Sequence, residues 1–427
     1  YYEGELSFRI ARSYGAGRYD ATYEEQGIDY PIGYVRFTEG RNIEEFVRLL
    51  AQKRVDVSDL ITHEIPFEQA ADAYEMITKN PKQERYIGVL LKYGENKEKW
   101  RNTVRNPLAK RAVSGKKIRL GLIGAGNFVR STMLPAMKAN GNYEFRGLAT
   151  TGGVGGAQAN DGTPFAYTTN NYKKLLADPE IDLIAVSTRH NSHAKFIVEA
   201  LQAGKSVYCE KPLCLTLEEL EQIKAAYEAS DGELFCGLNR RHAPLIRQIK
   251  EELKTDQIPA VYDFIANAGY IPEDHWVHDE AAGGGRILGE ACHFVDLLQY
   301  LDGSELISLR LTAAGNPMND TALLTLRFAS GAVGNIVYSS MGSKKYPKEQ
   351  LRVLSNGSVY EMDNFIRLKR YGSSKAVKEK LEQDKGIRAE YEYMFQVLQG
   401  KRDNETIRDA FLGQEMLIRA MQKVKEA

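Results

Sequence analysis

The segment from Gly283 to Asp296, GGGRILGEACHFVD, carries acidic, thiol and imidazole side chains at helical spacing. Glu290 and His293 are three residues apart, so a helix would place them on one face, and Asp296 continues the same row. An imidazole in such a place can accept the proton of a reacting hydroxyl group. We therefore predict His293 as a general base, with Glu290 or Asp296 as the acid that fixes its ring. Capping or pairing with a nearby group is the alternative for Asp296.

Two other interpretations of this segment are weaker. Cys292 and His293 are adjacent, hence about 100° apart on a helix, and no second pair of ligands is visible, which disfavours a metal site. No strand precedes the glycines of GGGR, so they do not form a phosphate loop. They more plausibly let the chain approach a substrate before a helix begins. We predict no metal ligands in this sequence.

A lysine ends one of the apolar runs of the sequence. Glu210-Lys211-Pro212 follows the β-favouring residues SVYC, and ligands of parallel sheets bind at the carboxyl ends of the strands. An ammonium group at such a place can stabilise the negative charge that develops on an alkoxide oxygen. The alternative for Lys211 is an exposed cation at the end of a strand.

A glycine pair follows the strand-like run KKIRLGLIG. Gly124-Ala125-Gly126 opens a helix-like segment, Val129–Ala139, in the context that a dinucleotide fingerprint requires. The pyrophosphate of a dinucleotide would lie at the start of this helix, against backbone N–H groups. A tight turn without a ligand is the alternative, and Val129 at the third glycine position crowds the helix against the strand. The predicted phosphate-binding residues are Gly124, Gly126, Asn127 and Phe128.

The second strand of this region ends at LATTG, where an NAD site usually has an acid that binds the ribose hydroxyls. Thr150 and Thr151 occupy that place, and no arginine follows to hold a 2′-phosphate. Small hydroxyl residues tolerate a phosphate better than a carboxylate would, so we lean to NADP and leave NAD open.

The elements that position these residues follow from the periodicity. Residues 116–238 alternate β-favouring runs with helical segments, which predicts a doubly wound parallel sheet in a Rossmann α/β domain. Residues 239–427 predict an α+β domain, in which helices are followed by the strands of an open, mostly antiparallel sheet. The predicted helices of this second part are Pro244–Leu253, Glu290–Leu301 and Glu392–Ala427, the last with breaks at Gly400 and near Asn404.

Residues 1–95 have the pattern of a partial domain that opens in the middle of a strand, ELSFRI, without an earlier partner strand. The predicted elements are helices at Asn42–Gln52 and Phe67–Ile77 and a strand at Leu60–Thr62. Residues 96–115 are polar and basic and are predicted to be a linker.

The composition excludes several classes of protein. Charged residues make up 27% of the 427 residues and the formal net charge is zero, so nucleic acid is not an expected partner. Apolar runs are far shorter than the ~20 residues of a membrane helix, and the start lacks the pattern of a signal peptide. Four scattered cysteines do not form a disulfide framework. We expect a reduced, cytoplasmic protein.

Residues 117–427 resemble the glucose–fructose oxidoreductase and inositol dehydrogenase family, Gfo/Idh/MocA. The motifs that carry the resemblance are GLIGAGNF at 121–128, STRHNSH at 187–193, AGKSVYCEKPL at 203–213, NRRHAP at 239–244 and GGGRILGEACHFVDLLQYL at 283–301. The resemblance implies a Rossmann domain, a substrate domain, and nicotinamide-dependent hydride transfer on a sugar or cyclitol. It also implies a homo-oligomer formed through the outer face of the C-terminal sheet.

The resemblance assigns roles to further residues. Lys211 would be catalytic, Pro212 would follow a cis bond, and His293 would be the histidine of the glycine-rich helix. The cofactor would also be bound by Thr188, His193, Glu210, Lys211 and Pro212. The substrate would be bound by Arg240, Arg241, His275 and Trp276. Capping or packing for His193, ion pairs at the domain interface for either arginine and a structural role for Trp276 are the alternatives.

One departure from the family pattern concerns the acid. Many members of the family have an aspartate four residues before the histidine, and this sequence has Gly289 there. Glu290, one step round the helix, either replaces that aspartate or only fixes His293.

The first 95 residues resemble a different family, the C-terminal part of medium-chain, zinc-alcohol-dehydrogenase-like reductases. GELSFRIARSYG, YPIGYVR and LITHEIPFEQAADAYEMI carry this resemblance. Two-part proteins of this type are often associated with bacterial surface-polysaccharide synthesis. The glycine fingerprint and zinc ligands of such a reductase are missing, and His63 alone is no zinc site. We expect no separate chemistry from this region, and the chain is expected to be a fragment of a longer protein.

Three hypotheses follow from the sequence. The leading one is an NAD(P)-dependent oxidoreductase that acts on a hydroxyl-bearing carbon of a sugar, nucleotide sugar or cyclitol. The second is a glycoside lyase or hydrolase that works by transient oxidation with a retained NAD. The third is a non-catalytic, nucleotide-binding scaffold.

Overall fold

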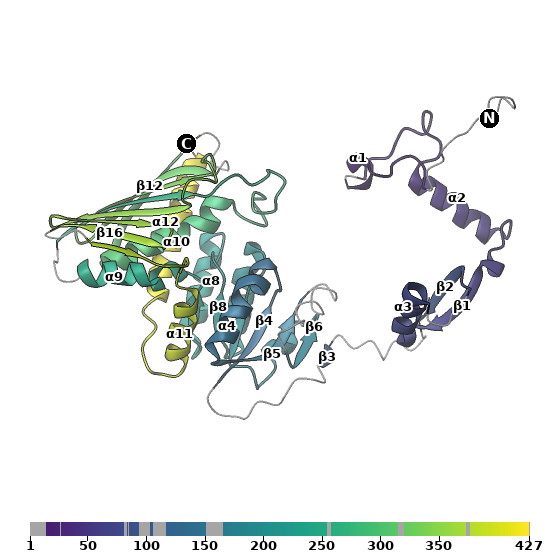
Figure 1. Ribbon diagram of the computed structural model, residues 1–427, viewed down its shortest axis with the longest axis horizontal. Helices are drawn as coiled ribbons and strands as arrows, with labels where there is room; N and C mark the ends of the chain where they lie inside the picture. The colour runs from purple at the N-terminus through teal and green to yellow at the C-terminus, as the bar shows by residue number, and fades with distance from the viewer. Residues whose placement is uncertain are drawn as a thin grey trace. The chain divides into compact units, whose positions relative to one another are not determined.

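A computed structural model of the chain describes residues 14–25, 27–80, 83, 85–93, 103–105, 117–150, 165–253, 258–314, 320–372 and 376–426 (Figure 1). The chain divides into two compact units, residues 1–100 and residues 101–427.

The first unit is built on a parallel pair of strands connected by a helix. Its elements are α1 (Ala21–Glu24), α2 (Glu39–Ala51), β1 (Ile61–Pro66), α3 (Ala70–Lys79) and β2 (Gly88–Lys92). The helices predicted at 42–52 and 67–77 are confirmed within a few residues, and the predicted strand lies slightly later, in β1. The strand predicted at ELSFRI lies outside the described residues. No residue of α2 is buried, and Ala73 is the buried residue of α3, so the described part of this unit has little core.

The second unit contains a seven-stranded sheet with the order β3-β6-β5-β4-β7-β8-β9. Its strands are β3 (Thr103–Arg105), β4 (Ile118–Ile123), β5 (Tyr143–Ala149), β6 (Tyr167–Thr169), β7 (Leu183–Val186), β8 (Ser206–Cys209) and β9 (Leu234–Cys236). All neighbours are parallel except β3, which runs antiparallel to β6. The Rossmann α/β fold predicted for this part is therefore confirmed. The strand β3 was not predicted, because it lies within the polar residues 96–115 that we interpreted as a linker.

Both faces of this sheet are buried, as its continuous apolar strands require. In β7, Ile184 and Val186 belong to the core that includes Ile197 of α7 (His193–Gln202) and Ile223 of α8 (Leu217–Glu228). The alternate residues Leu183 and Ala185 belong to the opposite core, together with residues of α4 (Leu134–Asn140) and of α11 (Ile387–Leu398). The sheet is thus sandwiched between α7 and α8 on one face and α4 and α11 on the other.

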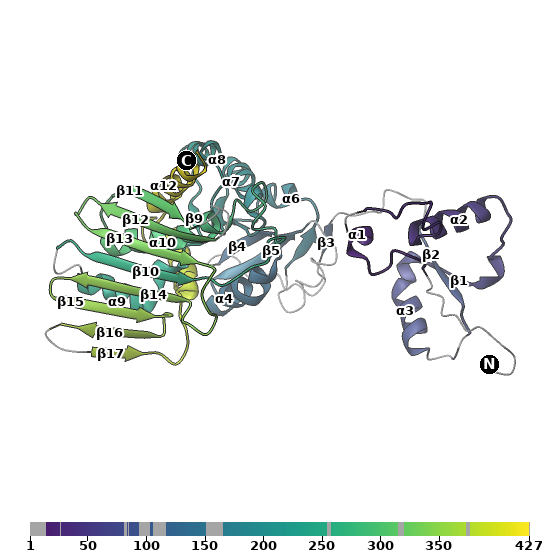
Figure 2. The same cartoon turned by 90° about the horizontal axis from the view of Figure 1, so that it is seen from above.

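An eight-stranded sheet forms the rest of the second unit, with the order β11-β12-β13-β10-β14-β15-β16-β17 (Figure 2). Its strands are β10 (Val261–Asn267), β11 (Leu306–Ala313), β12 (Thr321–Phe328), β13 (Val333–Ser339), β14 (Glu349–Ser355), β15 (Ser358–Asp363), β16 (Arg367–Tyr371) and β17 (Ala376–Glu379). Only the central pair β10 and β13 is parallel among these strands. The predicted, mostly antiparallel sheet is confirmed, although β10 and β17 were not predicted.

Helices cover one face of this sheet (Figure 1). They are α9 (Pro244–Leu253), α10 (Arg286–Asp302) and α12 (Ile407–Glu426). The ring of Phe294 in α10 stacks on Phe264 of β10, with 4.6 Å between the ring centroids. Because α10 is buried against the sheet along most of its length, the side chains that it carries are held in fixed positions.

The last two helices return to the Rossmann sheet. The Tyr143 hydroxyl donates a hydrogen bond of 2.5 Å to the carbonyl of Tyr391 in α11, and the Asn404 amide donates one of 2.8 Å to the Leu234 carbonyl in β9. Lys224 of α8 forms an ion pair of 2.8 Å with Glu415 of α12. These contacts join the two sheets within the second unit.

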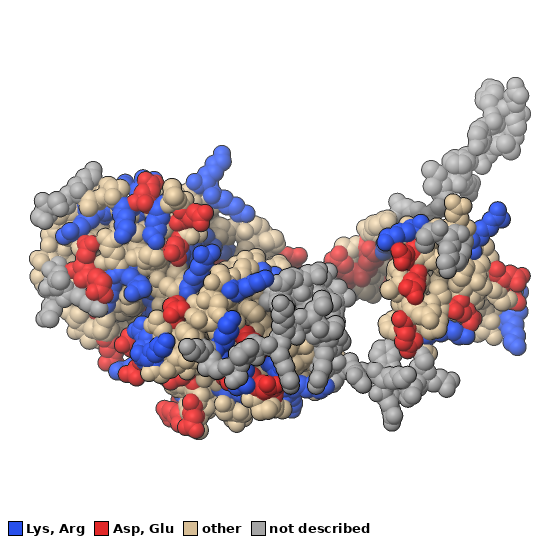
Figure 3. Space-filling model, turned by 60° about the horizontal axis from the view of Figure 1, so that its bottom comes forward, with Lys and Arg blue, Asp and Glu red and all other residues tan. Residues whose placement is uncertain are grey.

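No helix among the described residues is long and apolar enough to cross a membrane. On the face shown in Figure 3, basic and acidic side chains are interspersed over the second unit. This mixture agrees with the balanced charge of the sequence.

Candidate functional site

The turn after β4 is shaped by Gly124. Its φ angle is +98°, and a Cβ at this position would overlap the carbonyl oxygen of Ser187, just after β7. The Gly124 N–H donates a hydrogen bond of 2.9 Å to the Ala149 carbonyl at the end of β5. At Gly126, in contrast, a Cβ would meet no atom of the described residues within 4 Å. The backbone itself requires glycine at 124, whereas the open space at 126 fits the close approach of a dinucleotide phosphate.

The helix predicted after this turn is present. It begins at Asn127 and Phe128 and passes through a π-helical turn, η4 (Val129–Met133), into α4. Val129, which occupies the third glycine position of the fingerprint, is fully buried beneath the turn. Asn127 and Phe128 thus stand at the helix start, next to the open space at Gly126.

The end of β5 carries the predicted ribose side of the cofactor site. The Thr150 N–H donates a hydrogen bond of 3.0 Å to the Thr169 carbonyl of β6. Thr151 lies outside the residues that the structure describes. The choice between NAD and NADP therefore remains a prediction from the sequence.

His193, at the start of α7, is fully buried. Its Nδ1 lies 2.7 Å from the Pro212 carbonyl oxygen and its Nε2 lies 3.2 Å from the Thr188 carbonyl oxygen. Burial lowers the pKa of His193, and a neutral ring has one N–H, so the ring donates to one of these two carbonyl oxygens while it packs between the loop after β7 and the loop after β8. This geometry favours the packing alternative for His193, which positions the residues at the two strand ends.

The loop after β8 carries the predicted lysine. The peptide bond between Lys211 and Pro212 is cis, as the family resemblance implies. The Tyr208 hydroxyl donates a hydrogen bond of 2.7 Å to the Glu210 carboxyl group, and burial raises the pKa of Glu210. A Cβ at Gly237 would lie 2.9 Å from the Tyr208 hydroxyl, so the glycine directly after β9 makes room for this pair. Lys211 itself is half-buried.

His293 lies on α10, whose start is set by the glycine-rich segment. Gly284 and Gly285 have φ angles of +68° and +86°, and the helix begins at Arg286, four residues before the predicted start. The His293 ring is buried, and its Nδ1 has no hydrogen-bond partner in the part of the chain that is described. Burial lowers the pKa of His293 well below its usual range, and the charges of Arg240 and Lys211 act in the same direction. His293 is therefore held neutral, the form that can accept a proton.

Glu290 and Asp296, the two acids considered as partners of His293, pair with arginines instead. A carboxylate oxygen of Glu290 lies 3.3 Å from both Nε and Nη2 of Arg286, and Asp296 accepts a hydrogen bond of 2.9 Å from Nε of Arg241. Burial raises the pKa of Glu290, but the charges of Lys211 and Arg286 outweigh it and leave the pKa lowered. Glu290 is consequently a carboxylate within electrostatic reach of Lys211, and no hydrogen bond joins it to His293 in the described structure.

The two arginines predicted to bind substrate lie in a 3-10 turn, η6 (Asn239–His242). Arg241 is buried and forms ion pairs with Asp296 and Asp409. Arg240 donates hydrogen bonds of 2.9 and 3.0 Å to the fully buried Glu349, which also pairs with Lys385 at 2.5 Å. These contacts favour the ion-pair alternative for Arg241, while Arg240 lies near enough to His293 to lower its pKa.

The segment that carries His275 and Trp276 lies against His190, a residue to which the sequence analysis assigned no role. The ring of Trp276 contacts His190 edge to face, with 4.9 Å between the centroids. His190 is buried, and a Cβ at Gly289 would lie 2.7 Å from its Cε1 atom. His275 is exposed. No local pattern predicts the contact between His190 and Gly289, because it joins two distant segments; the missing aspartate at 289 is the only signal in the sequence.

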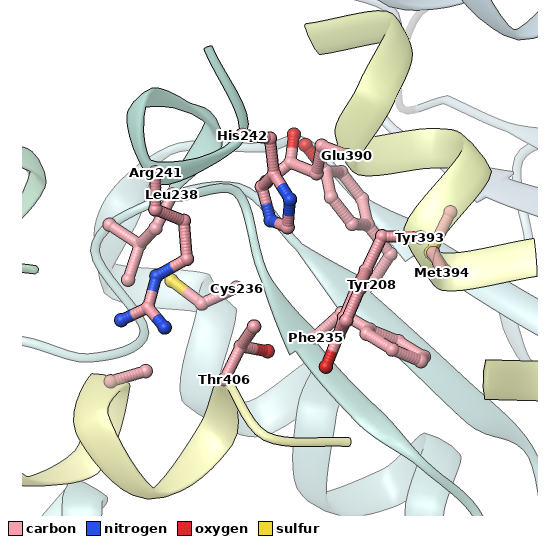
Figure 4. A pocket seen from close by; sticks show the side chains of 11 residues that line it. Tyr208, Phe235, Cys236, Leu238, Arg241, His242, Glu390, Tyr393, Met394 and Thr406 are labelled. Carbon is pink, nitrogen blue, oxygen red and sulfur yellow. The ribbon is translucent and has the colours of Figure 1, made fainter. Parts of the chain in front are cut away.

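A small pocket lies on another side of η6, between β8, β9 and the helices α11 and α12 (Figure 4). It is lined by Tyr208, Phe235, Cys236, Leu238, Arg241, His242, Glu390, Tyr393, Met394, Thr406 and Ala410. Burial and the nearby Glu210 and Asp296 raise the pKa of Glu390 well above its usual range. Of the residues predicted for cofactor, substrate or catalysis, only Arg241 lines it, so this pocket is not the candidate active site.

Across the described ranges, no group of three or more histidine, cysteine, aspartate or glutamate side chains is placed to hold a metal ion. Cys209, Cys214, Cys236 and Cys292 are free thiols. Burial raises the pKa of Cys292 to about 11, which makes a thiolate beside His293 unfavourable.

Comparison with known proteins decides the family. Residues 118–238 match the model of an oxidoreductase family with an NAD-binding Rossmann fold, and residues 246–359 match the model of a GFO/IDH/MocA C-terminal domain. The chain belongs to the Gfo/Idh/MocA family of oxidoreductases. Neither match includes the first unit, so its resemblance to medium-chain reductases remains a prediction.

The chain is similar to curated relatives over part of its length. This chain is 32% identical to a myo-inositol 2-dehydrogenase of Thermotoga maritima, over 38% of this chain and 51% of that protein. It is 28% identical to a 1,5-anhydro-D-fructose reductase of Ensifer adhaerens, over 50% of this chain and 67% of that protein. The matched part thus spans between half and two thirds of these relatives.

A solved structure shows the same fold. A levoglucosan dehydrogenase in complex with NADH superposes with a TM-score of 0.63, at 18% identity, and the match covers 72% of this chain and 97% of that one. This likeness supports the two-sheet architecture of the second unit.

Proposed function

We propose that the chain transfers hydride between NAD or NADP and a hydroxyl-bearing carbon of a sugar, nucleotide sugar or cyclitol. The family and its NAD-binding fold support the class of reaction. The relatives named for myo-inositol and 1,5-anhydro-D-fructose support a polyhydroxylated ring as the substrate. A part in surface-polysaccharide synthesis rests only on the resemblance of the first 95 residues.

The cofactor would lie along the turn at Gly124 and Gly126, with its phosphates at the start of the helix that follows. When bound, the nicotinamide supplies the acceptor or donor of the hydride. The end of β8 would direct Lys211 to the reacting oxygen, where the ammonium group stabilises negative charge. His293 would take the hydroxyl proton during oxidation and return it during reduction.

One observation carries this proposal. A buried, neutral histidine on a rigid helix has an Nδ1 without a partner among the described residues, and the charge of Lys211 acts on the ring. A buried polar atom without a partner is unfavourable unless it is used when a ligand binds. A base within the electrostatic influence of a cation that can stabilise an alkoxide oxygen suits the oxidation of an alcohol.

The test is a screen of sugars, cyclitols and nucleotide sugars with NAD and NADP, followed by Lys211→Ala. We expect the variant to keep binding the reduced cofactor, measured by fluorescence, and to lose at least 100-fold in kcat, about the effect of removing one charge-stabilising group. Lys423→Ala, at an exposed position on α12, is the control. Unchanged turnover in Lys211→Ala would refute the role of the lysine.

A further inference from the structure

The side chain of His190 fills the space next to Gly289. A Cβ at position 289 would lie 2.7 Å from Cε1 and 3.4 Å from Nδ1 of His190. Any residue larger than glycine would therefore push the ring away. The place of the aspartate that many family members have at this position is thus taken by an imidazole from the loop after β7.

The orientation of the His190 ring is fixed. Its Nδ1 lies 2.8 Å from the Gly283 carbonyl oxygen, which can only accept a hydrogen bond, so Nδ1 carries the proton. Burial lowers the pKa of His190 to about 4, which keeps the ring neutral. Nε2 consequently carries a lone pair, and this atom makes no hydrogen bond with the described residues.

His190 and His293 lie along one face of α10. Gly289 and His293 are four residues apart, so they occupy successive turns on the same side of the helix. His190 packs on the first of these turns and His293 projects from the second. The charge of Lys211 acts on both rings. One neutral imidazole on α10 and a second one packed against the same helix therefore both lie within the electrostatic influence of Lys211.

From this geometry we infer that His190 binds the substrate, its Nε2 accepting a hydrogen bond from a second hydroxyl group while His293 and Lys211 serve the reacting one. The inference rests on the proposed function and narrows its substrate to rings with at least two hydroxyl groups. His190 would thus set specificity and would take no proton in the reaction.

Three variants test this role: His190→Ala, Gly289→Ala and the double variant. With the best polyol of the screen, we expect each single variant to raise KM roughly tenfold, about the loss of one hydrogen bond, and to keep kcat within a factor of about two. The double variant should be no worse than His190→Ala, because the room at position 289 is then free. Additive effects, or an unchanged KM in His190→Ala, would overturn the inference.

Folding and the proposed function are controlled separately. Asn191→Ala alters an exposed side chain of the same loop and should leave KM unchanged. Nuclear magnetic resonance of ¹⁵N-histidine-labelled protein should show His190, identified by its loss in His190→Ala, with the proton on Nδ1; a proton on Nε2 contradicts the inference without any assay. If no polyol is oxidised, both proposals fail together; if Lys211→Ala is inactive while His190→Ala has normal KM, only this one fails.

Discussion

At the scale of single residues, the site depends on keeping a histidine neutral. His293 is buried on α10 and is surrounded by the charges of Arg240, Lys211, Lys385 and Lys348, all of which disfavour a second positive charge on the ring. Glu349 balances part of this charge, since it pairs with Arg240 and Lys385. The imidazole can therefore act as a base under conditions in which an exposed histidine would already be protonated.

This environment predicts the pH dependence of the reaction. Oxidation needs the neutral form of His293, and activity is lost only as the pH falls through its lowered pKa. The acidic limb of kcat/KM should hence lie clearly below the ~6.5 of ordinary histidine. It can be measured between pH 4.5 and 8 with saturating cofactor, with cofactor binding followed over the same range as the control. A limb at or above that value would contradict the assignment of His293 as the base.

The sequence predicted part of this site. His293 and Lys211 stand out because their types and positions, on a helix and at a strand end, have a local signature. The pairing of Asp296 with Arg241 and the contact of His190 with Gly289 have none, since each joins segments that only the fold brings together. Asp296 pairs with Arg241, which is the alternative to orienting His293 that the sequence left open.

At the scale of elements, long apolar runs were predicted well and short strands were not. The parallel strands β4 and β7 are buried on both faces, so they appear in the sequence as continuous apolar runs. β3 has three residues within a polar segment, and β10 is stabilised by pairing with the distant strands β13 and β14. Neither strand has a local signal strong enough to predict.

The turn after β4 contains one glycine that the backbone requires, Gly124, and one that we predict to contact the cofactor, Gly126. Gly124→Ala places a Cβ against the Ser187 carbonyl and forces a residue with a side chain into a φ angle of +98°, so we expect a lower melting temperature as well as lost cofactor binding. The methyl group of Gly126→Ala meets no atom within 4 Å in the part of the chain that the structure describes, so this variant should keep the melting temperature within about 1 °C.

The same pair of variants distinguishes the two roles. Gly126→Ala should weaken binding of the reduced cofactor, measured by fluorescence titration, because its methyl group enters the space left for the phosphate. Calorimetric unfolding of both variants without cofactor provides the stability comparison. A variant at 126 that binds the cofactor normally would show that the open space is not the phosphate site.

At the scale of the whole molecule, the eight-stranded sheet of the second unit has one face that is covered by helices α9, α10 and α12 and one that these helices leave open. The open face of the eight-stranded sheet carries an apolar row in adjacent strands. Val333 lies opposite Val261, Val261 lies opposite Leu354, and Leu354 lies opposite Val359. The exposed fractions of Val333, Val261 and Leu354 are 40%, 44% and 41%. A contiguous apolar row of this kind is typical of a surface that another protein covers.

We predict that this face joins two copies of the chain. The apolar row is flanked by charged residues of both signs, such as Arg352 near Asp263 and Glu361, which suits a self-complementary interface with a polar rim. Sedimentation velocity of the full chain should show a dimer or a larger closed oligomer. Val261→Lys combined with Leu354→Lys should dissociate it, because two buried ammonium groups without partners oppose association.

A matched substitution makes this experiment decisive. Gln222→Lys also adds a lysine at an exposed position, but on α8 beside the Rossmann sheet and away from this face, and should leave the oligomer intact. The double variant should retain its far-ultraviolet circular dichroism, since the substituted side chains point away from the core. A wild-type chain that sediments as a monomer at all concentrations, or a double variant that still associates, would show that the sheet face is not the interface.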